Sequence, residues 1–351
     1  MFGVSTTSIY GRDPSPAYTA QAGANLLMVS YNSVIWRSNL KNPSRWSQIG
    51  RSTVYPAIDV NVNQGDGNPY TSVYGNNKFI VPSSIQLTST GRPFGYYLQA
   101  GSGYTPIFVD SSITGPFYGL NIGSSAFGNG VFVMTGQQPG GSFGSFVRVF
   151  HSTNGTSWTA LNVANSGSSN VGQRVTFNNG KFFLSYSVGS SPPYATVMYK
   201  STNGTTWTSF AAPTAISAYW DTIALNNMLF TSSTTEQYYT SINEGASWSP
   251  VTPTGGGPNS KLPMLFVNGV YIKYLQVVDP AAYYTSINGY TWTVRLNPLN
   301  LTAFTVNAGK FIASDRSGVN IYESTDGVNW TLLEQAIECR FGSGALLYGT
   351  L

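Results

Sequence analysis

Short runs of alternating apolar and polar residues fill most of the chain, and the segments between them carry no apolar residues at helical spacing. Val147 to Phe150 and Thr159 to Leu161 are two such runs, and Ser152-Thr-Asn-Gly-Thr-Ser-Trp158 separates them. An Asn-Gly pair between alternating runs is a strong signal for a β-hairpin, because both turn residues need positive φ. The pattern therefore predicts strands joined by tight turns.

The turn that ends in tryptophan recurs five times, and we call these segments tryptophan turns. The steps from one Trp to the next are 49, 41, 44 and 38 residues. Recurrence at this spacing is typical of a repeat architecture. The repeated polar residue and the Trp of each turn are Asn154 and Trp158, Asn203 and Trp207, Asn243 and Trp248, Asn288 and Trp292, and Asp326 and Trp330.

A second kind of turn lies between the tryptophan turns, and we call it the inner turn. Its members fall at Asn76-Asn77, Asn129-Gly130, Asn179-Gly180, Asn227, Asn268-Gly269 and Ala308-Gly309, and similar segments begin at Gly23 and Gly342. Two hairpins in each repeat make a four-stranded antiparallel sheet, which is the blade of a β-propeller. We therefore expect an all-β fold with one β-propeller domain over residues 1–351.

The number of blades is open between eight and seven. Seven outer hairpins can be placed, whereas the segments that resemble inner hairpins number eight. Eight blades require the C-terminal hairpin at about 337–350 to be completed by an N-terminal strand at about 3–11. Seven blades leave that hairpin as an appendage. Strands from both termini in one sheet close the ring and remove exposed edges.

Composition excludes several classes of function. Only 9% of the residues are charged, and the net charge of +4 arises from scarce acids without any basic cluster, so we expect no nucleic-acid binding. The single His and single Cys cannot build a common zinc site or an internal disulfide, and we expect no metal and no cofactor. No apolar run is long enough to span a bilayer, and the N-terminal residues do not resemble a secretory signal, so we expect no membrane insertion.

The tryptophan turns resemble the Asp-box, or BNR, repeat of sialidase-like β-propellers, which also occur in phage tail and spike proteins and in bacterial surface proteins. The segment from Ser241 to Trp248 has the full spacing of that repeat, with Asn243 in place of Asp. The other four turns are one residue shorter, and only Asp326 keeps the carboxylate. The resemblance implies that these residues are architectural and form no catalytic site.

A sialidase-like enzyme would need three arginines on one substrate carboxylate, a Tyr–Glu pair and an acid/base Asp. The Arg-Ile-Pro of such enzymes is missing, and all five Glu follow residue 235. Asp221, before an expected inner strand, is the only well-placed acid for glycan hydrolysis. A Ser-His-Asp arrangement would have to use His151, which lies beside Ser152 at a tryptophan turn. We therefore expect no enzymatic activity and no catalytic residues, with glycan hydrolysis as the alternative.

Long connections are expected on one face only, because both the second-to-third strand connections and the links between blades leave a blade on the same side. Rigid rings beside amides suit sugars or protein surfaces. The candidate binding residues of this face are Tyr70, Gln137, Phe143, Tyr194, Tyr219, Trp220 and Asp221.

These features favour a non-enzymatic structural or host-recognition module of a virion, such as a phage tail, spike or fibre protein. Its partners would be a carbohydrate or a neighbouring structural subunit, and a surface with few charges suits a homo-oligomer within an assembly. Two alternatives stay open. One is a sialidase-like glycan hydrolase, and the other is a cytoplasmic scaffold that binds proteins.

Overall fold

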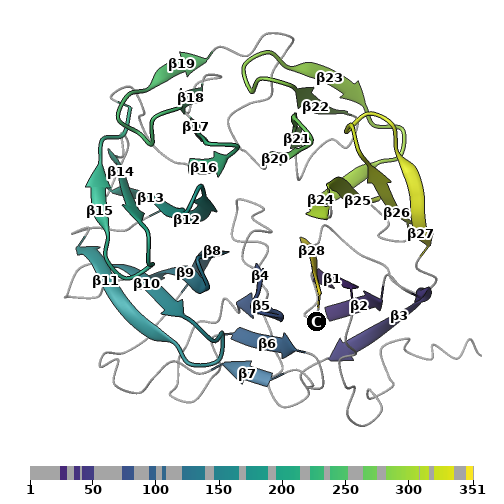
Figure 1. The fold of residues 1–351 in the computed structure, drawn as a ribbon, viewed down its shortest axis with the longest axis horizontal. Helices are drawn as coiled ribbons and strands as arrows, with labels where there is room; N and C mark the ends of the chain where they lie inside the picture. Colours follow the sequence, from purple (N-terminus) through teal and green to yellow (C-terminus); the bar gives the residue numbers. More distant parts are fainter. Residues whose placement is uncertain are drawn as a thin grey trace, which may run out of the picture.

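The computed structural model shows a ring of blades around one axis, with no helix among the residues it describes (Figure 1). The described residues form seven four-stranded antiparallel sheets. The described residues are 24–29, 35–39, 42–50, 73–82, 95–99, 105–107, 121–138, 146–165, 171–188, 195–213, 222–232, 238–251, 264–274, 282–307, 309–315, 320–335 and 345–350.

Each blade runs from an inner strand near the axis to an outer strand at the rim (Figure 1). Blade 1 contains β28 (Ala345–Thr350), β1 (Ala24–Val29), β2 (Ile35–Asn39) and β3 (Asn42–Gly50). Blade 2 contains β4 (Val73–Gly75), β5 (Lys78–Pro82), β6 (Gly95–Gln99) and β7 (Thr105–Ile107). Blade 3 contains β8 (Asn121–Gly128), β9 (Val131–Gln138), β10 (Phe146–Ser152) and β11 (Thr159–Asn165).

The remaining four blades follow in chain order. Blade 4 contains β12 (Val171–Asn178), β13 (Lys181–Val188), β14 (Ala195–Ser201) and β15 (Thr208–Phe210). Blade 5 contains β16 (Thr222–Leu225), β17 (Met228–Ser232), β18 (Tyr238–Ser241) and β19 (Ser249–Val251). Blade 6 contains β20 (Met264–Val267), β21 (Val270–Tyr274), β22 (Ala282–Ser286) and β23 (Thr293–Leu296). Blade 7 contains β24 (Leu301–Asn307), β25 (Lys310–Asp315), β26 (Asn320–Ser324) and β27 (Thr331–Gln335).

The ring closes inside blade 1, where the C-terminal strand pairs with the first described strand. β28 is antiparallel to β1, with Ala24 opposite Thr350 and Val29 opposite Ala345. Inner strands β24, β28 and β4 also contact one another in turn, which completes the circle. Within the described residues the count is therefore seven, the second of the two expected values.

Counting separate inner hairpins near residues 23–28 and 342–348 is wrong. The two segments are the two strands of one inner pair, although they come from opposite ends of the chain. The expected strand at about 3–11 and the segment 337–344 lie outside the described residues. The N-terminal contribution to the closing sheet is thus β1, the second strand of its blade.

The inner turns have the predicted geometry. At Asn129-Gly130 the φ angles are 49° and 75°, and at Asn179-Gly180 they are 48° and 74°. Both residues of each turn thus lie in the left-handed region, which Asn and Gly tolerate better than other residues. The blade 5 turn, Asn226-Asn227, follows the same rule without glycine.

Aromatic side chains repeat across the inner hairpins and connect each blade to its neighbour. Phe127 on β8 lies opposite Phe132 on β9, with ring centroids 4.6 Å apart, and Phe177 and Phe182 form the same pair in blade 4. Each inner ring also covers a glycine of the preceding blade. A Cβ added to Gly128 would lie 2.2 Å from the Phe177 ring, so this position accommodates only hydrogen.

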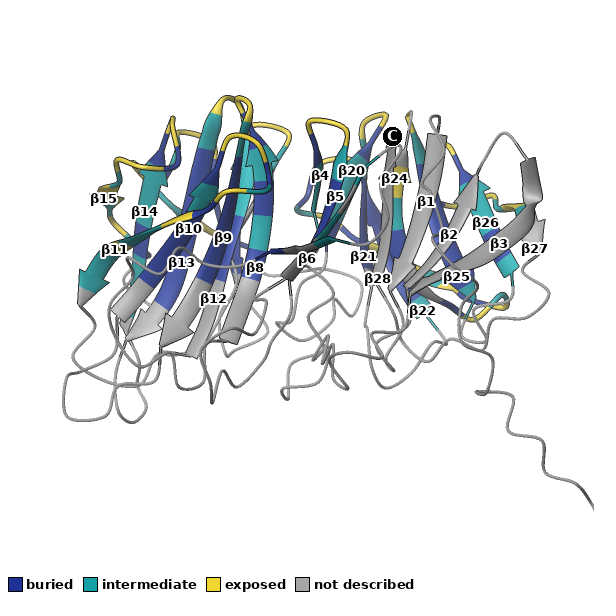
Figure 2. Ribbon diagram, turned by 90° about the horizontal axis from the view of Figure 1, so that it is seen from below, coloured by how far each residue is buried: buried dark blue, intermediate teal, exposed yellow. Residues whose placement is uncertain are grey.

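The hydrophobic core lies between neighbouring blades. One cluster joins Ile80 of blade 2 to Phe132, Phe150 and Trp158 of blade 3. Equivalent clusters join blades 3 and 4, blades 5 and 6, and blades 6 and 7. Burial is deepest in the middle of the strands, and the turns along one edge are exposed (Figure 2). Neighbouring blades therefore stabilise one another.

We predict that Gly128→Ala lowers the free energy of unfolding by about 2 kcal/mol, because overpacking against the Phe177 ring forces a shift of strand β8 or β12. The φ angle of Gly128 lies outside the left-handed region, so an alanine there adds no backbone strain and the cost is steric. Chemical denaturation of the variant measures it. In a Phe177→Leu background the same substitution should cost less, and an equal cost in both backgrounds would contradict the assigned contact.

Candidate recognition surface

The propeller has two different faces. The inner turns and the tryptophan turns lie together at one end of the strands, and we call this side the turn face. Figure 2 shows exposed turns along it in yellow. Antiparallel pairing places the other strand ends on the opposite edge, the loop face. Gln138 at the end of β9 lies opposite Phe146 at the start of β10, for example, so the connection between them leaves from the loop face.

Each tryptophan turn is held by its own Ser and Asn or Asp. In the blade 3 turn, the Ser152 hydroxyl accepts hydrogen bonds from the backbone N–H groups of Asn154 and Gly155, at 3.3 and 2.8 Å. The Asn154 side-chain oxygen accepts from the N–H groups of Thr156 and Ser157, at 2.9 and 2.8 Å. The other four turns repeat this pattern, including the longer blade 5 turn around Asn243. The polar residues of the motif therefore hold the backbone of each turn in place.

In the blade 7 turn, the carboxylate of Asp326 accepts the backbone hydrogen bonds that an Asn side chain accepts in the other turns. Burial opposes ionisation, but hydrogen bonds from the backbone of Asn329 and Val328 outweigh it and lower the pKa of Asp326 to about 2. An ionised carboxylate and a neutral amide oxygen thus accept the same backbone N–H groups. This equivalence explains why Asn can replace Asp in the other four turns.

The tryptophans donate their indole N–H to nearby oxygen atoms. Trp158 and Trp207 bond to the carbonyl oxygens of Gly155 and Gly204 in their own turns, at 3.0 and 3.1 Å. The later ones reach the preceding blade. Their acceptors are the Ala211 carbonyl for Trp248, the Tyr238 hydroxyl for Trp292 and the Tyr283 hydroxyl for Trp330. The tryptophans thus pack in the space between neighbouring sheets.

Glycine in each tryptophan turn lies directly against the preceding blade. A Cβ added to Gly204 would meet Val133 at 2.7 Å, and one added to Gly289 would meet Phe230 at 2.9 Å. A Cβ added to Gly245 would meet Phe210 at 2.3 Å, and one added to Gly327 would meet Ile272 at 2.8 Å. All of these glycines also have φ between 68° and 85°. The position is thus restricted to glycine by both the backbone and the neighbouring side chains.

Asparagine amides link one blade to the next on the turn face, and we call these contacts latches. The Asn129 Nδ2 of blade 3 donates to the carbonyl oxygens of Gly180 and Thr202 in blade 4, at 2.8 and 2.9 Å. Asn76 and Asn268 make the same pair of bonds to the blades that follow them. Asn recurs at the first position of these turns in the sequence, but the need for positive φ alone accounts for it, so the sequence does not predict the latch.

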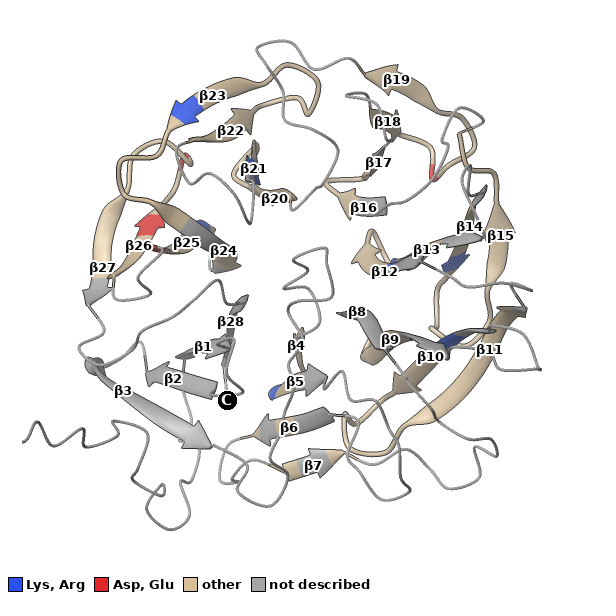
Figure 3. Ribbon diagram, turned by 180° about the vertical axis from the view of Figure 1, so that it is seen from behind, with Lys and Arg blue, Asp and Glu red and all other residues tan. Residues whose placement is uncertain are grey.

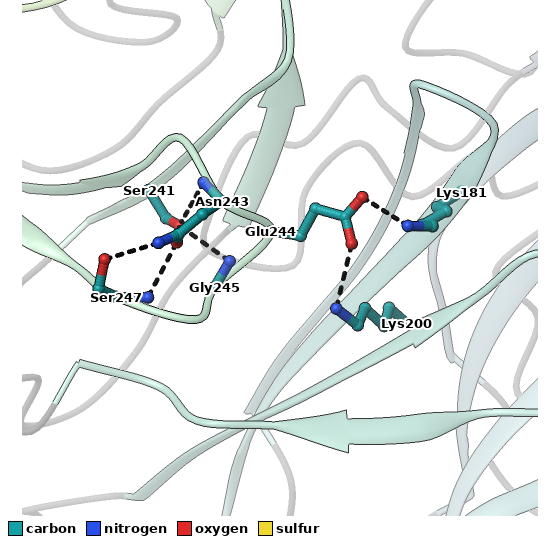
Figure 4. A network of polar contacts seen from close by, with 7 residues as sticks. All are labelled: Lys181, Lys200, Ser241, Asn243, Glu244, Gly245 and Ser247. Atoms are coloured by element: carbon teal, nitrogen blue, oxygen red, sulfur yellow. Dashed lines mark hydrogen bonds and ion pairs between the residues drawn. The ribbon is translucent and has the colours of Figure 1, made fainter.

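The interface between blades 4 and 5 uses an ion pair in place of the latch (Figure 4). Among the described residues Asn179 makes no side-chain hydrogen bond, although its turn has the same backbone geometry. Glu244, the additional residue of the blade 5 turn, accepts from Lys181 and Lys200 of blade 4, at 2.5 and 3.2 Å. The bond from Lys181 is the largest cause of the lowered pKa of Glu244.

We predict that Asn129→Ala lowers the free energy of unfolding by about 1–2 kcal/mol more than Asn179→Ala. Both substitutions place Ala at positive φ in the same kind of turn, so that strain cancels between them. Only Asn129→Ala also removes two hydrogen bonds to the next blade. Urea denaturation of the two variants measures the difference, and equal destabilisation would show that the latch contributes nothing.

Lys273 is a buried cationic side chain between blades 5 and 6. It lies on β21, and its side chain is only 2% exposed. Its Nζ is 5.7 Å from the ring centroid of Tyr238. Figure 3 shows the described Lys and Arg residues in blue. Burial lowers the pKa of Lys273 to about 7, because an apolar environment disfavours the charged form. Burial also raises the pKa of Tyr238 to about 12.

We predict that the folded protein gains stability as pH rises from about 7 towards 9. In that range the unfolded chain still binds a proton at Lys273 while the folded chain has lost it, so folding releases a proton. The slope is at most about 1.4 kcal/mol per pH unit. Thermal unfolding across this range measures it. Lys273→Met should raise the melting temperature at pH 7 and flatten the slope, whereas Lys310→Met, which removes a partly exposed lysine, should leave the slope unchanged.

The three arginines whose side chains are described occupy different positions in their blades. Arg148 is on the third strand of blade 3 and bonds to the Asn162 side chain at 3.0 Å, and Arg174 is buried on the inner strand of blade 4. Arg295 is on the outer strand of blade 6 and donates to the Thr285 hydroxyl. The three therefore share no common strand position. His151 is half-buried beside Ser152, whose hydroxyl is occupied by the turn bonds described above.

Most of the candidate binding residues lie outside the described residues. Gln137 is on β9 near the loop face, with its backbone described and its side chain not, and β16 begins immediately after Asp221. The others are Tyr70, Phe143, Tyr194, Tyr219, Trp220 and Asp221 itself. Their assignment to a binding site therefore stays a prediction.

The strand bounds nevertheless show that the connections on the two faces differ in length. Inner turns occupy two residues each, such as 129–130 between β8 and β9, whereas loop-face connections range from 297–300 to 51–72. The connection at 297–300 is described throughout, and its buried Asn297 donates to the carbonyl of Leu301 and accepts from its N–H, both at 2.9 Å. Variation in length is thus concentrated on the loop face.

The described residues contain neither a group of three or more His, Cys, Asp or Glu suited to a metal ion nor a helix long and apolar enough to cross a membrane.

No protein-family model matches the chain, and no curated protein matches its sequence. Solved structures with a similar fold do match. The designed protein Ika8 has a TM-score of 0.54 at 8% identity and covers 95% of both chains. A catalytically inactive virginiamycin B lyase from Staphylococcus aureus, solved with quinupristin, has a TM-score of 0.52 at 10% identity and covers 82% of this chain and 93% of that chain.

A third solved structure, YCF48 bound to D1 peptide, has a TM-score of 0.50 at 14% identity and covers 75% of this chain and 81% of that chain. Identities this low show the fold alone. The class is therefore established: the chain is a β-propeller of four-stranded antiparallel blades. Its function has to be argued from its own residues.

Proposed function

We propose that this propeller is a non-enzymatic recognition module that binds a neighbouring protein subunit through its loop face. The observation that carries the proposal is the concentration of variable connection lengths on that face, while the turn face consists of short, repeated, hydrogen-bonded turns. A rigid ring that holds variable loops on one side is suited to recognition, because the scaffold fixes the loops without restricting their sequences.

Composition supports a protein partner within an assembly. With 9% charged residues, the surface repels similar surfaces weakly, which favours packing against other subunits. YCF48, which has the same fold, was solved with a bound peptide, so a propeller of this kind can hold a polypeptide. A virion surface is the assembly we propose, and a glycan receptor is the alternative ligand of the same loops.

We predict that peptides selected from a displayed random library on the wild-type protein require the loop face. The double variant Tyr219→Ala/Trp220→Ala should weaken their binding about tenfold or more, because rigid aromatic residues carry much of the energy of such contacts. Ile287→Ser is the matched control, since Ile287 is 82% exposed on the turn face. Fluorescence anisotropy with the selected peptides measures both effects. Binding that Ile287→Ser abolishes and the double variant spares would overturn the proposal.

Two further measurements separate the alternatives. The first is a glycan array probed with the wild-type protein. A glycan signal that the double variant loses, together with failure to select any peptide, would favour a carbohydrate ligand. Release of fluorophore from a sialoside, abolished by Asp221→Ala, would establish a hydrolase and refute the non-enzymatic proposal.

A further inference from the structure

We propose that Asn179 is a site of spontaneous deamidation, selected from six Asn-Gly sequences by the contacts of its side chain. In this reaction the backbone nitrogen of the following glycine attacks the side-chain carbonyl carbon of Asn. Glycine permits this attack because it has no Cβ to obstruct it. The six sites begin at Asn129, Asn154, Asn179, Asn203, Asn268 and Asn288, and all lie within the described residues.

Three of the six are protected at the attacking nitrogen. In the tryptophan turns the N–H of Gly155, Gly204 or Gly289 donates to the serine hydroxyl of the same turn, at 2.8 to 2.9 Å. These glycines are buried, and the Asn oxygen accepts two further backbone bonds. Attack would require the whole turn to open first.

Two others are protected at the amide that must leave. The Nδ2 of Asn129 and the Nδ2 of Asn268 each donate to two carbonyl oxygens of the next blade, with distances from 2.7 to 3.3 Å. These bonds hold the side chain away from its own backbone. Rotation of the side chain into position for attack breaks both of them.

Asn179 has neither form of protection. Its turn matches those of Asn129 and Asn268 in φ, in exposure and in its glycine partner. Its side chain makes no hydrogen bond within the part of the chain that the structure describes, because blades 4 and 5 are joined through Glu244 and the two lysines instead. The substitution of an ion pair for the latch thus leaves this amide exposed to attack.

The chemistry needs only water as co-reactant. The Gly180 nitrogen forms a bond to Cγ of Asn179, the Cγ–Nδ2 bond breaks, and ammonia leaves with the proton that Gly180 loses. Water then adds to either carbonyl of the resulting five-membered succinimide and opens the ring. The products are an aspartate or an isoaspartate at position 179, each with a new carboxylate next to Lys181.

We predict that Asn179 deamidates about tenfold or more faster than Asn129 and Asn268 in the folded protein, since the latter must first break two hydrogen bonds. The full chain is incubated in mildly alkaline buffer at physiological temperature. Peptide mapping by mass spectrometry then follows each of the six sites, and an Asn179→Asp variant identifies the aspartyl product among the peptides.

The same incubation in denaturant is the control, because there the six sites differ only in local sequence. Comparable rates in denaturant together with selective modification of Asn179 in the native chain support the proposal. Equal native rates at Asn129 and Asn179 would overturn it, as would a preference for Asn179 that persists unchanged in denaturant. An Asn179→Ser variant should lose the acidic charge isoform that the wild-type protein accumulates first, and its persistence also counts against the assignment.

Discussion

The contact between the glycine of each tryptophan turn and the blade before it is the constraint on which the ring depends. A sheet of four short strands cannot bury both of its faces alone, so each blade is stable only against its neighbours. Close approach at this contact needs a residue with positive φ and no side chain, as the positions of Gly204 and Gly289 against Val133 and Phe230 show. Ser and Asn of the same turn fix the backbone that presents the glycine. The motif therefore determines how one blade packs on another.

Polar groups in the described residues are used chiefly to build this packing. Serine hydroxyls and asparagine oxygens satisfy turn amides, indole N–H groups find oxygen acceptors, and asparagine amides join successive blades. A protein with so few charges can form these bonds without ion pairs, and the Glu244 cluster shows how a charged residue takes over where one latch is missing. Neutral hydrogen-bonding groups also cost less to bury than charges do. The low charge content is thus consistent with the architecture itself.

Much of the fold could be predicted from the sequence, because its signals are local. Asn-Gly and Ser-x-Asn-Gly segments specify turns through φ preferences and short-range hydrogen bonds, and the structure has turns at Asn129, Asn179 and Asn268 where we expected them. The closing strand pair is not evident from the sequence, because Ala24 and Thr350 are far apart in the chain and the segments around them resemble two separate hairpins. The latches and the burial of Lys273 depend on contacts between blades, which no local pattern encodes. Candidate residues such as Tyr219 and Trp220 belong to connections whose sequences follow no repeat.

Closure through β28 has a consequence for how the chain acquires its shape during synthesis. Blades 2 to 7 are each built from consecutive strands and can assemble as they leave the ribosome. Blade 1 cannot, because β1 waits for a partner that is translated more than three hundred residues later. Until then β1 presents an unpaired edge, and bringing such distant segments together carries an entropic cost that slows the final step. Premature pairing of that edge with the β28 strand of another copy would produce a strand-exchanged dimer.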